Sequence, residues 1–379
     1  MDAASRPDPL PGPPPQGGRE RVRRAREFHA LTVADVRRET DEAVSVAFEV
    51  PDELKDSFRF VQGQYLTLRA TVNGEELRRP YSVCVAPEAG ELRVCVKKLH
   101  GGRFSSFVND VLKVGDSIDV MAPMGRFHAP DAPGAARHYV GFAGGSGITP
   151  VMSNLRAVLG REPESRFTLF YGNRNARGII FRDQLADLKD RFMGRLQIFH
   201  ILGDEIPEIE LFGGLMDEAK VKELSTRLID VEDVDWFFVC GPGPMMDAVS
   251  ASLAGLGVPE DRVRIESFGA RPFASQLAPP PEEDTGAGAD VEVRFGGVTT
   301  KIRVPFAGQP ILDAVHAAKI DAPYACKGGV CCSCRARLVE GEVDMDVVFG
   351  LEPDEIAAGY ILTCQSHPKT KRVVIDYDW

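Results

Sequence analysis

The sequence contains no run approaching the roughly 20 consecutive apolar residues needed to cross a bilayer, so we expect no membrane-spanning segment. Residues 1–16 are rich in proline and lack the basic-then-apolar order of a secretory signal. We therefore expect a cytoplasmic protein.

An excess of basic residues is also missing. The 379-residue chain has 45 Lys and Arg against 56 Asp and Glu, for a net charge of −11. Nucleic-acid binding needs Lys and Arg clustered on one face, so we expect no nucleic-acid partner. With 44% hydrophobic and 27% charged residues, the composition is that of a globular protein, and the length predicts two or three domains.

The cysteines lack the scattered layout of a disulfide framework, because four of the eight lie within residues 326–334. In a reducing compartment, this crowding indicates a metal centre. The sequence also has no two-His-one-carboxylate or Glu-x-x-His pattern at convincing spacing. We therefore expect no oxygen-activating site in this chain, and the final electron acceptor should be another protein.

What the chain does contain changes along its length. Residues 1–27 mix Pro, Gly and Arg with almost no apolar periodicity and are predicted to be a disordered tail. Residues 28–132 hold closely spaced β-rich runs separated by turn signals, which indicates an antiparallel β-barrel. The runs expected as strands are Ala43–Val50, Gln64–Val72, Tyr81–Ala86 and Glu91–Lys98.

The remaining sequence predicts two further domains. Residues 133–268 alternate strands with helices, the pattern of an α/β domain with a parallel sheet. Residues 269–289 contain three consecutive prolines, acids and small residues, which predicts a linker. Residues 290–379 begin with a predicted hairpin and form the C-terminal domain. In the α/β domain, the expected strands are Tyr139–Ala143, Phe167–Tyr171, Leu196–Leu202 and Trp236–Cys240, and the expected helices are Pro150–Leu159, Arg182–Phe192 and Met245–Leu256.

The most specific motif is Cys326-Lys-Gly-Gly-Val-Cys331-Cys-Ser-Cys334, with Cys364 about thirty residues later. Four and then two intervening residues is the plant-type spacing for a 2Fe-2S cluster, whose two irons need four thiolates. The two glycines would let the backbone fold tightly and offer amide donors to the sulfurs. A four-cysteine zinc site is the alternative, but zinc ribbons favour pairs of closely spaced cysteines.

The segments Ala325–Leu338 and Gly359–Gln365 resemble plant-type ferredoxins of the β-grasp fold, a resemblance that covers about the last ninety residues. Cys332 is interpreted as a small residue beside the cluster, without a ligand role. Cys84 and Cys95 stand mid-strand among apolar neighbours and are assigned to a core.

In the predicted barrel, Arg79-Pro80-Tyr81-Ser82 resembles the flavin signature of the ferredoxin-NADP reductase superfamily. An arginine can pair with the flavin phosphate, and an aromatic ring can pack on the isoalloxazine. A hydroxyl can reach the redox-active nitrogen, which makes Ser82 a candidate catalytic residue. By themselves, the four residues also fit a strand whose tyrosine simply packs in a core.

A second flavin element is Gly101-Gly102-Arg103-Phe104-Ser105, which opens a predicted helix, Phe104–Leu112. Free amides at a helix N-terminus bind a pyrophosphate, and glycines let it approach. The resemblance implies that Gly102 and Ser105 lie at FAD, and Lys97 on the preceding strand could add positive charge. A plain turn and helix cap is the alternative.

Two motifs indicate a nicotinamide cofactor. Gly144-Gly145-Ser146-Gly147-Ile-Thr149-Pro150 follows a strand and precedes a helix, the context that makes a Gly-rich turn credible for phosphate binding. It resembles the superfamily's nicotinamide loop. Cys240-Gly241-Pro242-Gly-Pro-Met245 resembles the superfamily's second motif, whose cysteine lies near the hydride-bearing carbon, so Cys240 is a second candidate catalytic residue. A buried inert thiol is the alternative reading of Cys240.

Glu266-Ser267-Phe268 resembles the superfamily's terminal element beside the flavin, which makes Phe268 a candidate flavin contact. The choice between NADPH and NADH stays open. Arg174 could bind a 2′-phosphate, whereas Asp204 and Glu205 would repel one if they lined the pocket.

The order of the three predicted domains indicates an NAD(P)H-dependent electron-transfer enzyme. A nicotinamide gives two electrons as a hydride, the cluster accepts one, and a flavin can do both. Nearly the whole chain after the tail resembles the reductase subunits of bacterial phenylacetyl-CoA epoxidase complexes. The residues carrying that resemblance include 74–79, 101–105, 185–189, 324–331 and 351–355.

The resemblance implies a partner, since that family delivers electrons to a di-iron oxygenase that epoxidises the aromatic ring of phenylacetyl-CoA. Two other functions remain open. One is the reductase of a different oxygenase, such as a steroid, alkane or aromatic hydroxylase. The other is a redox sensor whose cluster reports state without carrying turnover current.

Overall fold

In the computed structural model, the described residues are 27–268, 288–351 and 353–379. Residues 1–26 of the predicted tail and residues 269–287 of the predicted linker lie outside the described residues. The chain divides into two compact units, Phe28–Phe268 and a second unit that contains the described residues from Gly288 to Trp379. Each unit has its own hydrophobic core.

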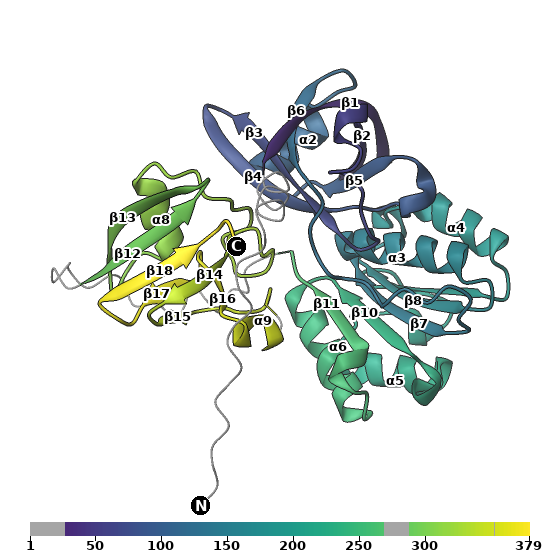
Figure 1. The fold of residues 1–379 in the computed structure, drawn as a ribbon. Coiled ribbons are helices and arrows are strands. Elements are labelled where there is room, and N and C mark those ends of the chain that lie inside the picture. The colour runs from purple at the N-terminus through teal and green to yellow at the C-terminus, as the bar shows by residue number, and fades with distance from the viewer. Residues whose placement is uncertain (1–26, 269–287, 352) are drawn as a thin grey trace, which may run out of the picture. The chain divides into compact units, whose positions relative to one another are not determined.

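The first unit begins with six antiparallel strands in the order β4-β3-β6-β1-β2-β5 (Figure 1). A bridge between Val83 and Val94 joins the two edge strands, so the sheet closes into a barrel. Helix α2 (Arg103–Asp110) packs on β5, β3 and β2. The strands are β1 (Phe28–Thr40), β2 (Ala43–Glu49), β3 (Tyr65–Val72), β4 (Glu75–Ser82), β5 (Leu92–Lys97) and β6 (Ser117–Met121).

Three strands of the barrel differ from the sequence prediction. The predicted strand Tyr81–Ala86 is wrong in its bounds, because β4 already starts at Glu75. The turn at Asn73 and Gly74 has positive φ angles of 53° and 80°, which lets the charged residues after it pair with β3 at once. Strands β1 and β6 were not predicted, although β1 buries Leu31 and Val33 in a regular alternation with exposed neighbours.

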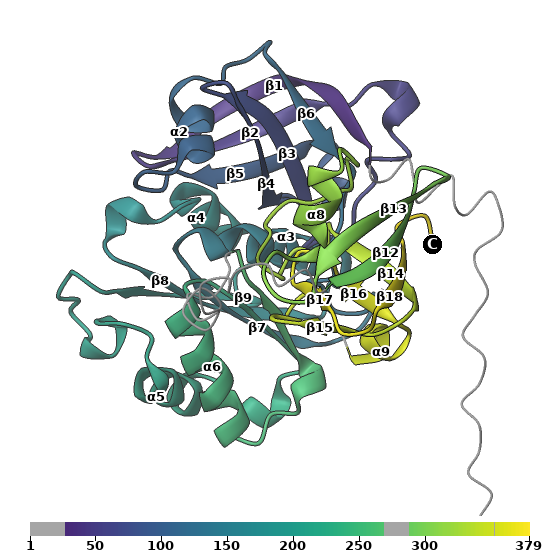
Figure 2. The ribbon, with the colours of Figure 1, turned by 90° about the vertical axis from the view of Figure 1, so that its left-hand side faces the viewer.

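The α/β half carries a five-stranded parallel sheet in the order β11-β10-β7-β8-β9. Figure 2 shows α3 and α4 between the barrel and this sheet, with α5 and α6 on the opposite face. The strands are β7 (His138–Gly144), β8 (Arg166–Asn173), β9 (Leu196–Leu202), β10 (Trp236–Cys240) and β11 (Val263–Glu266). The helices are α3 (Ile148–Arg161), α4 (Arg182–Arg191), α5 (Glu218–Leu228) and α6 (Gly243–Gly255).

Alternating side chains on the parallel strands pack into two different hydrophobic cores, one on each face of the sheet. Tyr139 and Ala143 of β7 join the core that the barrel also contributes to, whereas Val140 and Phe142 pack with α5 and α6. Helix α5 was not predicted; five of its eleven residues are charged, and it buries only Val221, Leu224 and Ser225.

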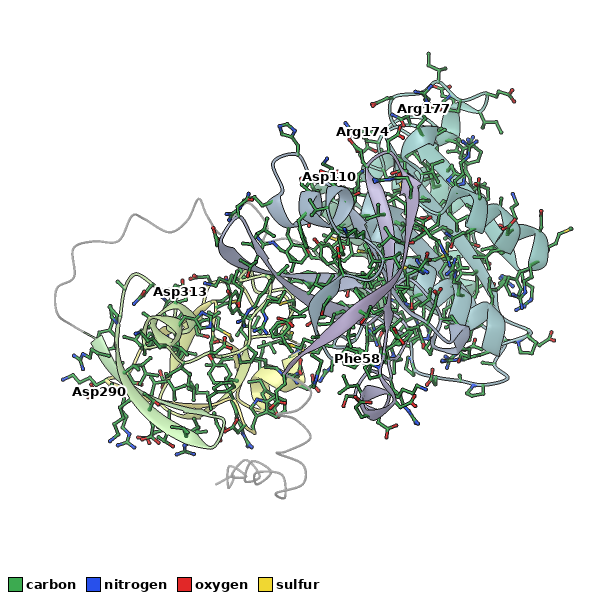
Figure 3. The ribbon with its side chains drawn as sticks, turned by 90° about the horizontal axis from the view of Figure 1, so that it is seen from above. Phe58, Asp110, Arg174, Arg177, Asp290 and Asp313 are labelled. Atoms are coloured by element: carbon green, nitrogen blue, oxygen red, sulfur yellow. The ribbon has the colours of Figure 1, made fainter. Side chains whose placement is uncertain are left out.

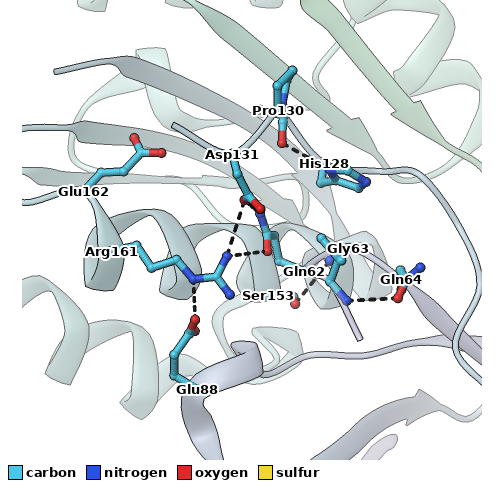
Figure 4. A network of polar contacts seen from close by, with 12 residues as sticks. Gln62, Gly63, Gln64, Glu88, His128, Pro130, Asp131, Ser153, Arg161 and Glu162 are labelled. Atoms are coloured by element: carbon cyan, nitrogen blue, oxygen red, sulfur yellow. Dashed lines mark hydrogen bonds and ion pairs between the residues drawn. The ribbon is translucent and has the colours of Figure 1, made fainter. Parts of the chain in front are cut away.

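The barrel and the α/β half are fixed to each other by polar contacts as well as by the shared core (Figure 4). Ser153 of α3 donates a hydrogen bond to the Val85 carbonyl at 2.7 Å and accepts one from the Gly63 amide at 3.3 Å. Arg161, at the end of α3, pairs with Glu88 and bonds Gln62 Oε1 at 3.1 Å. These contacts hold the two halves as one unit.

The second unit contains a mixed sheet in the order β13-β12-β18-β14-β16, with β12 parallel to β18, and a separate pair β15-β17. Strand β12 begins at Gly288, so the predicted boundary between linker and domain at residue 290 falls inside a strand. Its elements are β12 (Gly288–Phe295), β13 (Val298–Pro305), α8 (Ile311–Ala317), β14 (Arg335–Glu340), β15 (Val343–Met345), α9 (Pro353–Ala357), β16 (Tyr360–Leu362), β17 (Ser366–Pro368) and β18 (Arg372–Asp376).

The predicted fold class, an antiparallel barrel, a parallel-sheet α/β domain and a C-terminal ferredoxin domain, is confirmed. Among the described residues, no helix is both long and apolar enough to cross a membrane.

Candidate functional site

The first flavin motif lies on β4. Arg79 is exposed and its guanidinium donates to the Arg78 carbonyl at 2.7 Å, while Ser82 is buried. The Tyr81 ring lies 5.9 Å from that of Phe104, and burial raises the pKa of its hydroxyl. On β3, opposite Pro80, the hydroxyl of Thr67 is buried without a hydrogen-bond partner among the described residues. A buried hydroxyl needs a hydrogen-bond partner, and a polar cofactor bound beside this motif would supply one.

Glu266 connects the two candidate catalytic residues. The Ser82 hydroxyl donates to Glu266 Oε2 at 2.8 Å, although Ser82 and Glu266 lie 184 positions apart. Glu266 ends β11 and stands beside Cys240 in the parallel register. Burial raises the pKa of the Glu266 carboxyl to about 8. Burial, with Glu266 as a second cause, raises the pKa of the wholly buried Cys240 thiol well above its ordinary value.

The sequence interpretation placed Glu266 in the terminal element but gave it no role of its own. The acidic residue at the end of a strand was visible in the sequence, but only the structure places that strand beside the strand of Cys240. Near neutral pH, the Ser82 hydroxyl, the protonated Glu266 carboxyl and the neutral Cys240 thiol therefore lie together at this site.

The second flavin element lies at the start of α2, and two of its side chains are engaged within the protein. Ser105 accepts a hydrogen bond from the Leu99 amide and donates one to the Gly102 carbonyl, both at 3.1 Å. Arg103 makes a two-pronged ion pair with Glu75 at 2.6 and 3.0 Å. The first free amides of α2 remain available to a phosphate.

A cavity of about 480 Å³ lies between the start of α2 and the β3–β4 hairpin. Its walls include Asn73, Gly101, Gly102, Arg103 and Phe107. The cavity puts the backbone of the two glycines next to an open space, as a bound pyrophosphate would require.

The two nicotinamide motifs meet at a larger cavity of about 530 Å³ at the carboxyl ends of the parallel strands. Residues from both motifs line it together with Lys97, and its walls include Gly144, Gly145, Pro242 and Met245. A Cβ added at Gly145 would meet only Lys97 Nζ, at 3.7 Å. Lys97, predicted for the flavin element, thus faces the nicotinamide cavity.

Gly147 allows the two motifs to touch. A Cβ at this position would lie 2.0 Å from the carbonyl oxygen of Cys240, a distance that no side chain tolerates. The Thr149 hydroxyl donates to the Ser146 carbonyl at 3.0 Å and closes the turn, and Pro150 is buried in the first turn of α3.

Two predicted contacts lie at the margins of the site. Arg174 lines the nicotinamide cavity with an exposed guanidinium, and Figure 3 shows it near Arg177 at the edge of the α/β half. Asp204 and Glu205 do not line the cavity, and Glu205 accepts a hydrogen bond from the Ala176 amide at 2.8 Å.

Phe268 lies two residues beyond β11 and is 37% exposed.

The four predicted cluster ligands converge as two pairs. A hydrogen bond with Cys331 lowers the pKa of the Cys326 thiol, and one with Cys334 lowers the pKa of Cys364. Among the described residues, no three His, Cys, Asp or Glu side chains are placed to hold one metal ion. The two pairs together supply the four thiolates that a 2Fe-2S cluster needs.

Backbone amides also point at the sulfurs. The Gly328 amide donates to Cys326 Sγ at 3.2 Å and the Cys326 amide donates to Cys331 Sγ at 3.4 Å. Gly329 has a φ of +74°, and a Cβ there would lie 2.9 Å from Val347. The fifth thiol of the region, Cys332, contacts the Gly350 carbonyl.

The chain matches three family models in order along its length. They are the oxidoreductase FAD-binding domain at residues 30–129, the oxidoreductase NAD-binding domain at 142–251 and the 2Fe-2S iron-sulfur cluster binding domain at 294–369. The fold and these matches define an oxidoreductase that uses FAD, NAD(P)H and a 2Fe-2S cluster.

Relatives with similar architecture serve oxygenases. The chain is 42% identical over 352 residues to one of the subunits of the 1,2-phenylacetyl-CoA epoxidase of Escherichia coli K12, covering 93% of this chain and 98% of the relative. It is 35% identical to the ferredoxin reductase component of 3-ketosteroid-9-alpha-monooxygenase from Rhodococcus rhodochrous, covering 92% and 96%.

Among solved structures, phthalate dioxygenase reductase, a modular structure for electron transfer from pyridine nucleotides to [2Fe-2S], has a TM-score of 0.56. It is 27% identical, with 92% of this chain and 98% of the other covered. The chain belongs to the family of electron-transfer reductase components of oxygenase systems.

Proposed function

We propose that this reductase takes electrons from NADPH and delivers them to a di-iron oxygenase acting on phenylacetyl-CoA. The observation that carries the proposal is the 42% identity to the phenylacetyl-CoA epoxidase subunit of Escherichia coli, which extends over 93% of this chain. We also propose a cytoplasmic location, since NADPH and thiolate ligands that must stay reduced both belong there.

The described side chains divide the work between three sites. Bound FAD would accept a hydride from the nicotinamide and pass electrons singly to the cluster. The start of α2 and the exposed Arg79 would hold the flavin phosphates, while Lys97 would face the nicotinamide phosphates. Ser82, held by Glu266, would orient the flavin edge against the nicotinamide, and Cys326, Cys331, Cys334 and Cys364 would hold the cluster.

The direct test is NADPH oxidation by the purified protein mixed with a phenylacetyl-CoA epoxidase oxygenase complex, scored for epoxide product. Phenylacetyl-CoA-dependent turnover is the expected result. If the flavin and cluster are reduced but no epoxide forms, the partner assignment fails and the electron-transfer activity stands.

A second candidate is the reductase of a steroid monooxygenase, which the 35% identity to the 3-ketosteroid-9-alpha-monooxygenase component favours. The two candidates share every cofactor site and differ in the acceptor. Parallel assays with a ketosteroid oxygenase therefore separate them, because only the true partner should support product formation coupled to NADPH consumption.

NADPH is the proposed donor because the exposed Arg174 lines the cavity. An acid, Asp217, lines it as well, but its carboxylate accepts a hydrogen bond from the Lys220 amide at 2.8 Å at the start of α5. Arg174 is among the lining residues, whereas Asp204 and Glu205 are not. Replacing Arg174 by alanine should lower kcat/KM for NADPH by roughly tenfold to a hundredfold, the worth of a charge-assisted hydrogen bond. NADH kinetics should stay unchanged, as should both donors in an Arg191→Ala control. Equal losses with NADH and NADPH would contradict 2′-phosphate recognition by Arg174.

A further inference from the structure

The side chain of Gln365, the residue after Cys364, reaches from one cysteine segment to the other. Gln365 is only 7% exposed. Its Nε2 donates to the Lys327 carbonyl at 3.0 Å and to the Cys364 carbonyl at 2.9 Å, and lies 3.7 Å from Cys364 Sγ. Because Nε2 faces two carbonyl oxygens, which only accept, the orientation of the amide group is fixed.

One of the two carbonyls that Gln365 binds belongs to Lys327, whose backbone conformation in the cysteine loop is unusual. Lys327 stands between Cys326 and Gly328 with a φ of +53°, a conformation that few side chains adopt. Its ammonium group pairs with Asp313 at 2.8 Å and lies 4.9 Å from the centroid of the Tyr324 ring. The loop is thus held at Lys327 by α8 on one side and by Gln365 on the other.

The main chain of Gln365 is anchored without help from its side chain. The Gln365 amide donates to the Leu362 carbonyl at 2.9 Å, and its carbonyl accepts from the Asp346 amide at 3.0 Å. A buried amide side chain is costly unless it makes hydrogen bonds. What this one adds is a link between the first and last cysteines and a donor next to a sulfur.

We propose that Gln365 is a positioning residue for the iron–sulfur centre, which fixes the Lys327 loop and raises the tendency of the cluster to accept an electron. Reduction adds negative charge to the cluster. Both Nε2 protons are directed at carbonyl oxygens, so Nε2 acts on Cys364 Sγ, 3.7 Å away, as the positive end of the amide dipole, which stabilises that charge. The inference rests on the proposed ligand set of Cys326, Cys331, Cys334 and Cys364. It adds a residue outside that set.

The test uses the full-length protein with both cofactors and three variants: Gln365→Met, Gln365→Glu and the control Ser366→Ala. Methionine keeps the length without a donor, and glutamate keeps the shape but brings an acceptor and a negative charge. Ser366 is also buried, and among the described residues its hydroxyl donates to the Leu362 carbonyl alone, at 2.8 Å. Iron and sulfide content and the cluster midpoint potential are measured, with the flavin potential in the same sample as reference.

Gln365→Met should lower the equilibrium constant for one-electron reduction of the cluster by about tenfold, which corresponds to about 59 mV. Gln365→Glu should lower it further, while Ser366→Ala and all flavin potentials stay at the wild-type values. Loss of the cluster from both Gln365 variants, with Ser366→Ala fully loaded, would equally support the positioning role.

Unchanged potentials in fully loaded Gln365 variants would overturn the proposal, as would an equal shift in Ser366→Ala. A wild-type protein without a 2Fe-2S spectrum would instead refute the ligand set, so the two failures are distinguishable.

Discussion

Glu266 is the residue at which the two candidate catalytic side chains meet. Its carboxyl accepts the Ser82 hydrogen bond and lies beside Cys240 across the parallel strands. With a pKa raised to about 8 by burial, the carboxyl keeps its proton near neutral pH. The edge proposed to receive the nicotinamide therefore carries no fixed negative charge from Glu266 that would oppose an incoming anionic cofactor.

Replacing Glu266 by glutamine is expected to remove part of the pH dependence of stability. The folded protein holds this proton up to a pH of about 8, whereas the unfolded chain releases it above the ordinary value of 4.5. The free energy of unfolding should therefore fall as pH rises between those values. Urea titrations should show a smaller fall in Glu266→Gln than in the wild type or in the surface variant Glu164→Gln. Identical pH slopes in all three proteins would refute the raised pKa.

Single residues can be predicted most specifically where the spacing along the chain defines the chemistry. The cysteines at 326, 331, 334 and 364 could be named because a two-iron cluster demands that spacing. Glu266 could not, since its partner Ser82 lies 184 positions away and only the fold brings them together. Arg103 illustrates the opposite case: a plausible phosphate ligand that the structure pairs with Glu75.

At the scale of elements, the nicotinamide site depends on how closely the turn before α3 approaches the end of β10. The approach requires a glycine at 147, because a Cβ there would collide with the backbone of Cys240. The same packing places Gly144 against Pro242 and Met245. The two nicotinamide motifs therefore form one continuous wall of the nicotinamide cavity.

Gly147→Ala should lower the free energy of unfolding by about 1–3 kcal/mol through overpacking, and should slow flavin reduction by NADPH because the cavity wall is displaced. Gly160→Ala is the control, since Gly160 lies in α3, the helix that Gly147 precedes, with nothing within 4 Å of the added methyl. The control should gain roughly 0.5–1 kcal/mol of stability and keep normal flavin reduction. Wild-type stability and kinetics in Gly147→Ala would contradict the close approach.

Charge alone did not prevent prediction, because the charged helix α4 was expected at Arg182–Phe192 and is observed at Arg182–Arg191. Strand β10 was predicted with its observed bounds, Trp236–Cys240, because an entirely apolar run is typical of a buried parallel strand. Helix α5 buries only Val221, Leu224 and Ser225, and the start of β4 depends on a tight turn, so the positions of both follow from packing and turn geometry. Local sequence alone carries too little of that information.

At the scale of the whole molecule, the two units have separate cores. The barrel and the sheet beside it share one core, whereas the C-terminal unit packs around its own strands and α8. The candidate hydride donor and acceptor sites therefore belong to one compact unit, and the candidate cluster ligands belong to another.

Calorimetry of the full-length protein should resolve two unfolding transitions, as expected for domains with independent cores. Asp378→Ala should lower the temperature of one transition only. The Asp378 carboxylate accepts from the Gly296 and Gly297 amides at 2.9 and 2.7 Å and ties the chain end to the β12–β13 hairpin. Loss of cluster absorbance should follow that transition. A single transition that shifts as a whole would contradict the division into two units.

The measurement that tests the account most directly is anaerobic stopped-flow mixing of the protein with NADPH, in which flavin and cluster reduction are followed separately. We predict that the flavin is reduced first and the cluster afterwards. In Cys334→Ser, flavin reduction should proceed at the wild-type rate with no cluster signal. Cluster reduction that precedes the flavin, or that occurs in flavin-free protein, would contradict the electron path from NADPH through FAD to the cluster.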